Sequence, residues 1–156
     1  MIISYTATGD VQLKTKTEPV ILGSSIKIGD YTIPGPGEYD IASIQCEGQA
    51  VSGAFVYFLR DEDLIITFIT KLDPTAAKVD GIADTAILVL DVRSDDTPET
   101  AKSIIKAIEP AYVFLIGAGA TSSFGSQLGI PLAESSTLKV TRAGLPLEGI
   151  ILVPNA

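Results

Sequence analysis

Two short apolar runs on either side of a helix pattern constrain the fold of this chain more than any other feature of its sequence. Residues 86–90 and 112–116 are continuously apolar, which is typical of strands buried on both faces. Residues 97–108 between them begin with Thr-Pro-Glu and place apolar residues at helical spacing. A helix that joins two strands in this way leaves them parallel. We therefore expect a β-rich α+β or α/β fold with one main helix at about residues 98–108.

The segments before residue 71 show a different pattern, in which apolar and polar residues alternate over short distances between turn residues. This alternation predicts strands with one face in water. Gly48 and Gly53 are expected to interrupt the strands around them, and Gly29-Asp30 is expected to form a hairpin tip. Strands are predicted at residues 2–5, 11–16, 20–22, 39–46, 51–59, 64–70, 138–141 and 150–153, with helical turns at 73–78 and 122–128.

No repeat, linker or low-complexity segment divides the 156 residues, so we expect a single domain over residues 1–156. The first residues lack the basic region and long apolar run of a signal peptide, so we expect none, and the apolar runs are too short to cross a bilayer. We therefore expect a cytoplasmic protein that makes no contact with a membrane.

The composition excludes several kinds of catalytic site, because the chain contains no histidine. Ser-His-Asp and Cys-His nucleophile systems and histidine-based zinc sites are all ruled out. The single cysteine, Cys46, cannot form an internal disulfide and is expected to be a packed small residue. A net charge of −8 disfavours nucleic acid as a partner and suits a basic protein surface.

The segment from Ile33 to Ile41, Ile-Pro-Gly-Pro-Gly-Glu-Tyr-Asp-Ile, is similar to a Gly-Pro-Gly-Glu-Tyr motif of a known family. The strands of residues 2–22 precede it in the family's order. The acidic turn and apolar strand of 79–92 and the helix and strand of 97–116 follow it in that order. Together they resemble the metallo-β-lactamase superfamily, and within it a compact bacterial branch of predicted Zn-dependent hydrolases. The resemblance implies a shortened two-sheet sandwich with few helices, in which the Pro-Gly turn belongs to the scaffold.

The metal site that the resemblance implies is not matched by this chain. The family uses a His-x-His-x-Asp-His loop, two further histidines and a bridging aspartate. Residues 23–32 leave no room for that loop, and Gly117-Ala-Gly-Ala stands where the last histidine is expected. Only Asp73, near the expected bridging position, keeps a possible ligand type. The resemblance therefore implies a degenerate, non-catalytic member that holds no cofactor.

Three other carboxylates remain candidates for a site built from oxygen ligands. Glu38 and Asp40 lie close together, and such side chains either bind a hard cation or occupy a solvated strand edge. Asp91 ends the first apolar run, at the end of a parallel strand where ligands bind in α/β units. The nearby Asp95 and Asp96 are expected to favour the N-terminus of the following helix.

The loop Gly117-Ala-Gly-Ala-Thr-Ser-Ser follows the second apolar run and precedes a predicted helical turn. It is either a plain turn or a loop that binds a small anion through Gly117, Gly119, Thr121 and Ser122.

Three hypotheses follow from these observations. In the first, the chain is a non-catalytic binding or scaffold protein that uses its edge strands to bind a protein partner or to associate into a homo-oligomer. In the second, it is a residual hydrolase or phosphoesterase that holds Mg²⁺ or Mn²⁺ with carboxylates. In the third, it binds a small anionic ligand through the 117–123 loop.

Overall fold

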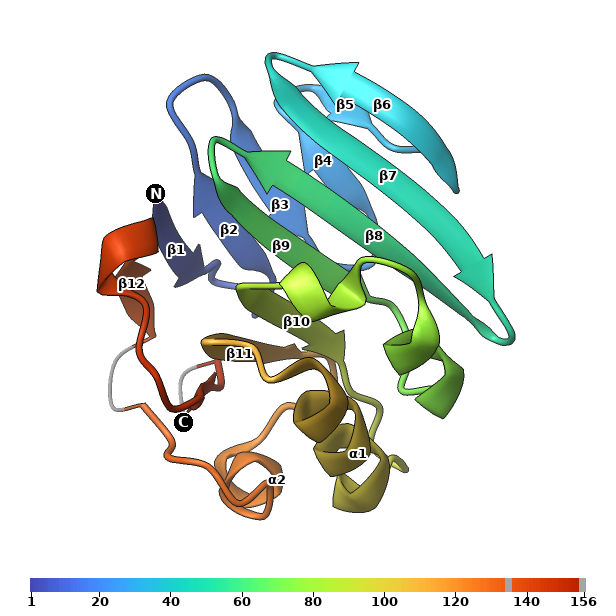
Figure 1. Ribbon diagram of the computed structural model, residues 1–156, viewed down its shortest axis with the longest axis vertical. Coiled ribbons are helices and arrows are strands. Elements are labelled where there is room, and N and C mark those ends of the chain that lie inside the picture. Colours follow the sequence, from blue (N-terminus) through green and yellow to red (C-terminus); the bar gives the residue numbers. More distant parts are fainter. Residues whose placement is uncertain (134–135, 155–156) are drawn as a thin grey trace.

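The computed structural model describes residues 1–133 and 136–154, which form two β-sheets packed face to face (Figure 1). The first sheet is antiparallel throughout, and its spatial order is β12-β1-β2-β3-β4-β5. Its strands are β1 (Ile2–Tyr5), β2 (Val11–Lys14), β3 (Pro19–Leu22), β4 (Ile26–Ile28), β5 (Tyr31–Thr32) and β12 (Thr137–Lys139).

The second sheet is mixed, and its spatial order is β13-β11-β10-β9-β8-β7-β6. The half from β13 to β9 is parallel, and the half from β9 to β6 is antiparallel. Its strands are β6 (Gly37–Ile41), β7 (Ile44–Val51), β8 (Ala54–Asp61), β9 (Leu64–Ile69), β10 (Ile87–Asp91), β11 (Tyr112–Ile116) and β13 (Ile150–Leu152).

The predicted strand–helix–strand unit is confirmed. Helix α1 (Pro98–Ile108) connects β10 to β11, and the two strands are parallel neighbours. Thr97 occupies the N-cap position, although its side chain caps no backbone N–H, and Glu109 ends the helix in the left-handed conformation. The buried residues of the helix form one apolar stripe, and each fully buried Ile contributes about 1.5–3 kcal/mol. These residues are Ala101, Ile104, Ile105 and Ile108.

Two apolar layers hold the molecule together, and they use opposite faces of the second sheet. One layer fills the space between the sheets, where Leu13 and Leu22 of the first sheet meet Leu59 and Phe114 of the second. The other layer lies on the outer face of the second sheet, under α1 and the short helix α2 (Ser122–Ser126) (Figure 1). Burial on both faces explains why β10 and β11 are apolar along their whole length.

Three short 3₁₀ helices complete the described elements: η1 (Pro74–Lys78), η2 (Ile82–Asp84) and η3 (Arg142–Gly144). The helical turns predicted near residues 73–78 and 122–128 are therefore confirmed. Over the described parts of the chain, none of the helices has the length and apolar character needed to span a membrane.

The prediction of one strand over residues 39–46 is wrong, because the chain turns back at Ala42-Ser43. Both residues have positive φ, 51° and 67°, and Ile41 pairs with Ile44 across the turn. Two consecutive left-handed residues form a type I′ hairpin turn, which usually has Asn-Gly at its centre. Ala-Ser carries no such signal, so local propensity did not indicate the turn.

The expectation that Gly48 interrupts a strand is also wrong. Gly48 lies inside β7 and pairs with Gly37 on one side and Tyr57 on the other. The side chain of Tyr57 occupies the space beside it, so the position requires a glycine without any break in pairing. The interruption expected at Gly53 is confirmed, since Ser52-Gly53 forms the turn between β7 and β8. The strand predicted over residues 51–59 therefore begins only at Ala54.

Candidate functional site

A depression lies at the carboxyl ends of β9 and β10, and it is the candidate site of this fold. Its volume is about 560 Å³. The strand ends provide Thr70, Lys71, Asp91 and Arg93, and the loops after β3, β5 and β7 form the opposite wall. In open α/β sheets, ligands bind in the crevice outside the carboxyl ends of the parallel strands. The remaining lining residues are Gly23, Ser24, Ser25, Ile26, Ile33, Pro34, Gly35, Gly53, Phe55, Tyr57 and Phe68.

Asp91 is the sequence-predicted candidate that the structure places in this depression. It ends β10 and is half-buried, and burial raises the pKa of its carboxyl above the ordinary value. The positive charge of Arg93 partly offsets that rise, while the carboxylates of Asp96 and Asp10 add to it. One half-buried carboxyl beside a guanidinium can accept a proton or a hydrogen bond.

The sequence pattern did not indicate two cations and an exposed aromatic ring that also line the depression. Lys71 and Arg93 each lie two residues beyond the end of a strand, and Phe55 is 43% exposed with its ring 6.3 Å from that of Tyr57. The rule that singled out Asp91 at a strand end applies equally to these two cations, so it could have found them. With them, the depression offers positive charge as well as a carboxyl.

The 117–123 loop packs beside Asp91 and uses several of its backbone donors internally. The N–H groups of Gly119, Ala120 and Thr121 donate to the carbonyls of Val92, Gly117 and Gly119 at 2.8, 3.1 and 2.9 Å. The side chain of Thr121 accepts from the Phe124 N–H at 3.1 Å and so caps α2. Because these groups are occupied, the loop presents fewer N–H donors to an anion than its glycine content indicates.

Ser122 is the last of the four residues predicted to bind an anion. Its hydroxyl oxygen is buried and has no hydrogen-bond partner among residues 1–133 and 136–154. Helix α2, which begins at this residue, has only five residues.

Asp73 lies next to the depression, but its carboxylate binds groups of the neighbouring loops. Its carboxylate accepts from the N–H and hydroxyl of Thr75 at 3.0 and 2.7 Å, and from the Gly53 N–H at 3.4 Å. These hydrogen bonds, first of all the one from the Thr75 hydroxyl, lower the pKa of the Asp73 carboxyl. The residue thus caps η1 and ties it to the β7–β8 turn.

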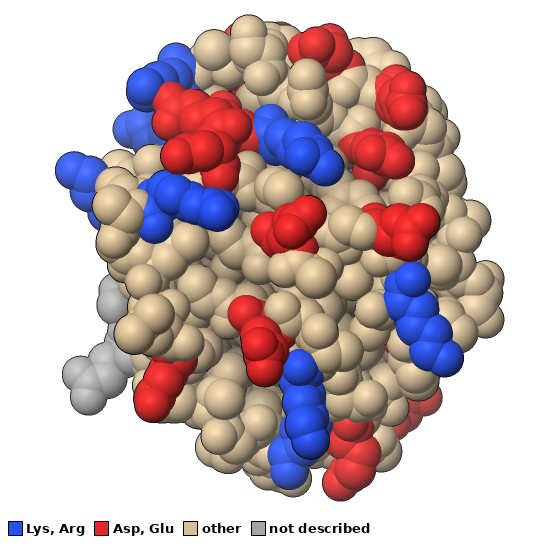
Figure 2. All heavy atoms as spheres, viewed as in Figure 1, with Lys and Arg blue, Asp and Glu red and all other residues tan. Residues whose placement is uncertain are grey.

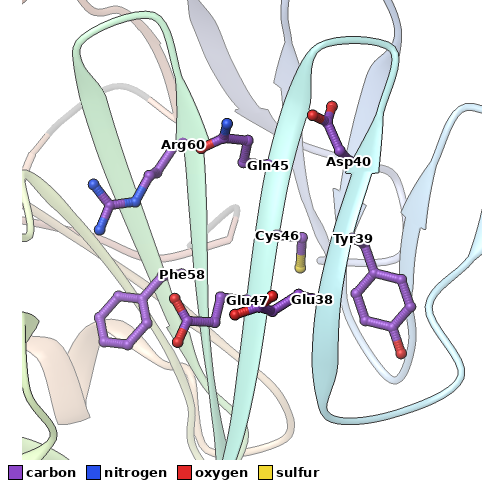
Figure 3. A pocket seen from close by; sticks show the side chains of 8 residues that line it. All are labelled: Glu38, Tyr39, Asp40, Gln45, Cys46, Glu47, Phe58 and Arg60. Atoms are coloured by element: carbon purple, nitrogen blue, oxygen red, sulfur yellow. The ribbon is translucent and has the colours of Figure 1, made fainter.

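Glu38 and Asp40 lie elsewhere, on the exposed face of the edge strand β6. They line a separate hollow over β6, β7 and β8 together with Glu47 and Arg60 (Figure 3). Glu38 pairs directly with Glu47, so two like charges face each other across the strands. Cys46 also borders this hollow, but its side chain is buried, and burial raises the pKa of its thiol to about 11. The thiol is therefore protonated at neutral pH, which fits a packed residue rather than a nucleophile.

The structure does not bring the four candidate carboxylates together. Asp91 lies in the depression, Asp73 caps a helix beside it, and Glu38 and Asp40 lie on β6. No group of three or more Asp, Glu, Cys or His side chains that could hold a metal ion is found in the described part of the chain.

Comparison with known proteins identifies the fold. The sequence matches no family model, and no curated protein matches it. A crystal structure from Thermotoga maritima, of a candidate Zn-dependent hydrolase of the metallo-β-lactamase superfamily, superimposes with a TM-score of 0.69. The match covers 97% of this chain and 98% of that chain, at 11% sequence identity. The chain has the metallo-β-lactamase fold.

This comparison confirms the fold that the resemblance implied, down to the shortened two-sheet sandwich with few helices. In the metallo-β-lactamase fold seen here, the depression with Asp91 lies at one end of the sandwich, between the carboxyl ends of the parallel strands and loops of the first sheet. At this level of identity the match establishes the architecture, and the chemistry has to be argued from the residues of this chain.

Proposed function

We propose that this chain is a non-catalytic binding protein that keeps the metallo-β-lactamase fold and acts by contact with a protein partner. The observation that carries the proposal is the sequence itself, which contains no histidine in 156 residues. A hydrolytic zinc site needs several nitrogen or oxygen ligands that converge on one point. The four candidate carboxylates that could replace imidazole ligands lie at separate places in the described part of the fold.

The charge of the molecule supports a partner of opposite sign. The net charge is −8, and acidic side chains are spread over the region of β6 to β8 (Figure 2). Such a surface attracts a basic protein and repels a polyanion such as nucleic acid. The partner is either another protein or, in a homo-oligomer, a second copy of this chain, and the encounter takes place in the cytoplasm.

The fold alone is no argument against catalysis, because it is also the fold of a candidate Zn-dependent hydrolase. The test therefore measures metal binding and turnover directly. Purified protein is analysed for metal content and molar mass, melted with Mg²⁺, Mn²⁺ or Zn²⁺, and assayed with a phosphodiester substrate. Unchanged melting temperatures and no turnover are expected. Metal-dependent turnover that is lost in Asp91→Asn would overturn the proposal and establish the carboxylate-based hydrolase.

Binding of a small anion is the second candidate function, and the positions of Lys71 and Arg93 favour it. Both cations line the depression at the strand ends, so the anion is expected there rather than on the loop that follows β11. Inorganic phosphate or a dicarboxylate should raise the melting temperature, and Lys71→Ala combined with Arg93→Ala should abolish that rise.

A further inference from the structure

Strand β6 ends the second sheet, and one of its edges carries no partner strand within the described residues. On its other edge, Ile41 and Ile44 close the two-residue hairpin to β7. In such a hairpin the closing pair is hydrogen-bonded, and bonded pairs alternate with non-bonded ones along the strands. The backbone groups of Gly37, Tyr39 and Ile41 therefore point toward β7, and those of Glu38 and Asp40 point toward the free edge.

No other segment of residues 1–133 and 136–154 satisfies these outward-pointing groups. The hydrogen bonds outside the regular elements include none to the backbone of Glu38 or Asp40. An exposed edge with free N–H and C=O groups can pair with an added strand, and natural proteins often prevent this with lysine or proline. Here the two residues that face outward are both acidic.

The two sides of this edge have different chemistry. On the outer face, Glu38 and Asp40 are exposed, and Glu47 lies directly across from Glu38 (Figure 3). On the inner face, the half-buried ring of Tyr39 lies 6.3 Å from that of Tyr31, which is 46% exposed at the edge of the first sheet. A strand added beside β6 would direct alternate side chains to these two faces, because side chains alternate along a strand.

This arrangement decides between the two kinds of partner. If β6 paired antiparallel with β6 of a second copy around Tyr39, Glu38 of each copy would face Asp40 of the other on the same face. Like charges directly opposite each other destabilise a strand pair, whereas opposite charges stabilise it. A strand with lysine or arginine at alternate positions places a positive charge against each carboxylate, and its intervening apolar residues cover Tyr31 and Tyr39.

We propose that the free edge of β6 binds an extended segment of a partner protein in which basic and apolar residues alternate. The backbone of Glu38 and Asp40 supplies the hydrogen bonds, their carboxylates select the basic residues, and the Tyr31–Tyr39 pair receives the apolar ones. The proposal rests on the proposed function as a binding protein and names the chemistry of its partner.

A labelled peptide, acetyl-Lys-Val-Lys-Val-Lys-amide, tests the proposal by fluorescence anisotropy with the full chain. We expect saturable binding that weakens with salt and is about tenfold weaker in the Glu38→Lys/Asp40→Lys variant. The matched control, Asp80→Lys/Asp95→Lys, makes the same change in net charge at exposed positions away from β6 and should bind nearly as well as the parent. Amide exchange of Glu38 and Asp40 should slow when the peptide is added.

Two further peptides separate strand pairing from general charge attraction. The same peptide methylated at its lysine backbone nitrogens keeps its charge but loses the donors that face β6, so it should not bind. A peptide with its lysines grouped together keeps its charge but loses the alternation, so it should bind more weakly. Equal binding of all three peptides, or an equal effect of the two charge-reversal pairs, would overturn the proposal.

The remaining outcomes distinguish this inference from the function on which it rests. Absence of any peptide binding, in a protein without metal-dependent turnover, would overturn the β6 inference and leave the proposed function in place. Metal-dependent turnover would overturn the proposed function whatever the peptide does. Slow amide exchange at Glu38 and Asp40 without peptide, in a protein of dimeric mass, would assign the edge to a second copy and overturn the choice of partner.

Discussion

The ring of Tyr57 lies against Gly48 on the neighbouring strand, in the space that a side chain at position 48 would occupy. A Cβ atom built on Gly48 would lie 2.5 Å from Cε1 of the ring and 3.2 Å from the Cα of Pro36. The two residues are direct partners between β7 and β8. The missing Cβ of the glycine thus leaves room for both the aromatic ring and the Pro-Gly turn to pack against the backbone.

Replacing Gly48 with alanine should lower the free energy of unfolding by about 1–3 kcal/mol, because the added methyl group displaces the ring from its packed position. Urea unfolding followed by circular dichroism measures the loss. In a Tyr57→Ala background the same replacement should cost less, since the ring is no longer present. Equal costs in both backgrounds would show that the ring does not set the requirement for glycine.

The turn at Ala42-Ser43 predicts a stabilising double substitution. Both residues have positive φ, which is unfavourable for alanine and serine and favourable for asparagine and glycine. Ala42→Asn with Ser43→Gly should raise the free energy of unfolding by about 1 kcal/mol. For a chain of this size the melting temperature should then rise by about 2–4 °C, as measured by calorimetry. A lower melting temperature would argue against a type I′ turn at this position.

We expect the carboxyl of Asp91 to make the stability of the protein depend on pH. Burial raises its pKa in the folded state above the ordinary value of 3.8, so the folded protein binds this proton more tightly than the unfolded chain does. The contribution of Asp91 to stability therefore falls as the pH rises from that value through the folded pKa. Asp91→Asn should be more stable than the parent at pH 7 and equally stable near pH 3, in urea unfolding at both values.

Asp73 provides a control of opposite sign for that experiment. Hydrogen bonds from Thr75 and Gly53 lower the pKa of the Asp73 carboxyl in the folded state. Its contribution to stability is present above the ordinary pKa and is lost as the pH falls through the folded value. Asp73→Asn should therefore lower stability at pH 7 and have little effect at low pH. The same sign for both variants would contradict these assignments.

At Gly119, in the loop beside Asp91, we expect a single added methyl group to destabilise the protein strongly. A Cβ on this residue would meet the carbonyl oxygen of Arg93, which is fixed backbone, and would lie 2.7 Å from Cγ1 of Val92. Gly119→Ala should lower the free energy of unfolding by at least about 1–3 kcal/mol in chemical denaturation. Gly35→Ala is the matched control, because its Cβ would meet no atom within 4 Å. If both variants are equally stable, the close packing of this loop is not as described.

The strand–helix–strand unit of residues 86–116 was predictable because its signals are local. Apolar runs, a Pro at the start of the helix and one apolar stripe each depend on neighbours along the chain. The hairpin at Ala42-Ser43 was not predictable in the same way. Alanine and serine give no local signal for a turn, and the pairing of β6 with β7 decides their backbone conformation.

For the candidate site, too, some properties follow from the sequence alone and others depend on the tertiary structure. The lack of histidine, and with it the exclusion of imidazole chemistry, follows from the residues alone. The positions of the carboxylates do not, because the order of the strands in the assembled sheet decides where each one lies. Asp91 ends an inner strand, Asp73 caps η1 beside it, and Asp40 lies on the edge strand β6. Packing between segments far apart in the chain also left β6 at an edge with Glu38 and Asp40 outward. The sequence determines which reactive side chains the protein has. Which of them lie close together, and which backbone edges are exposed, depends on how the sheets assemble.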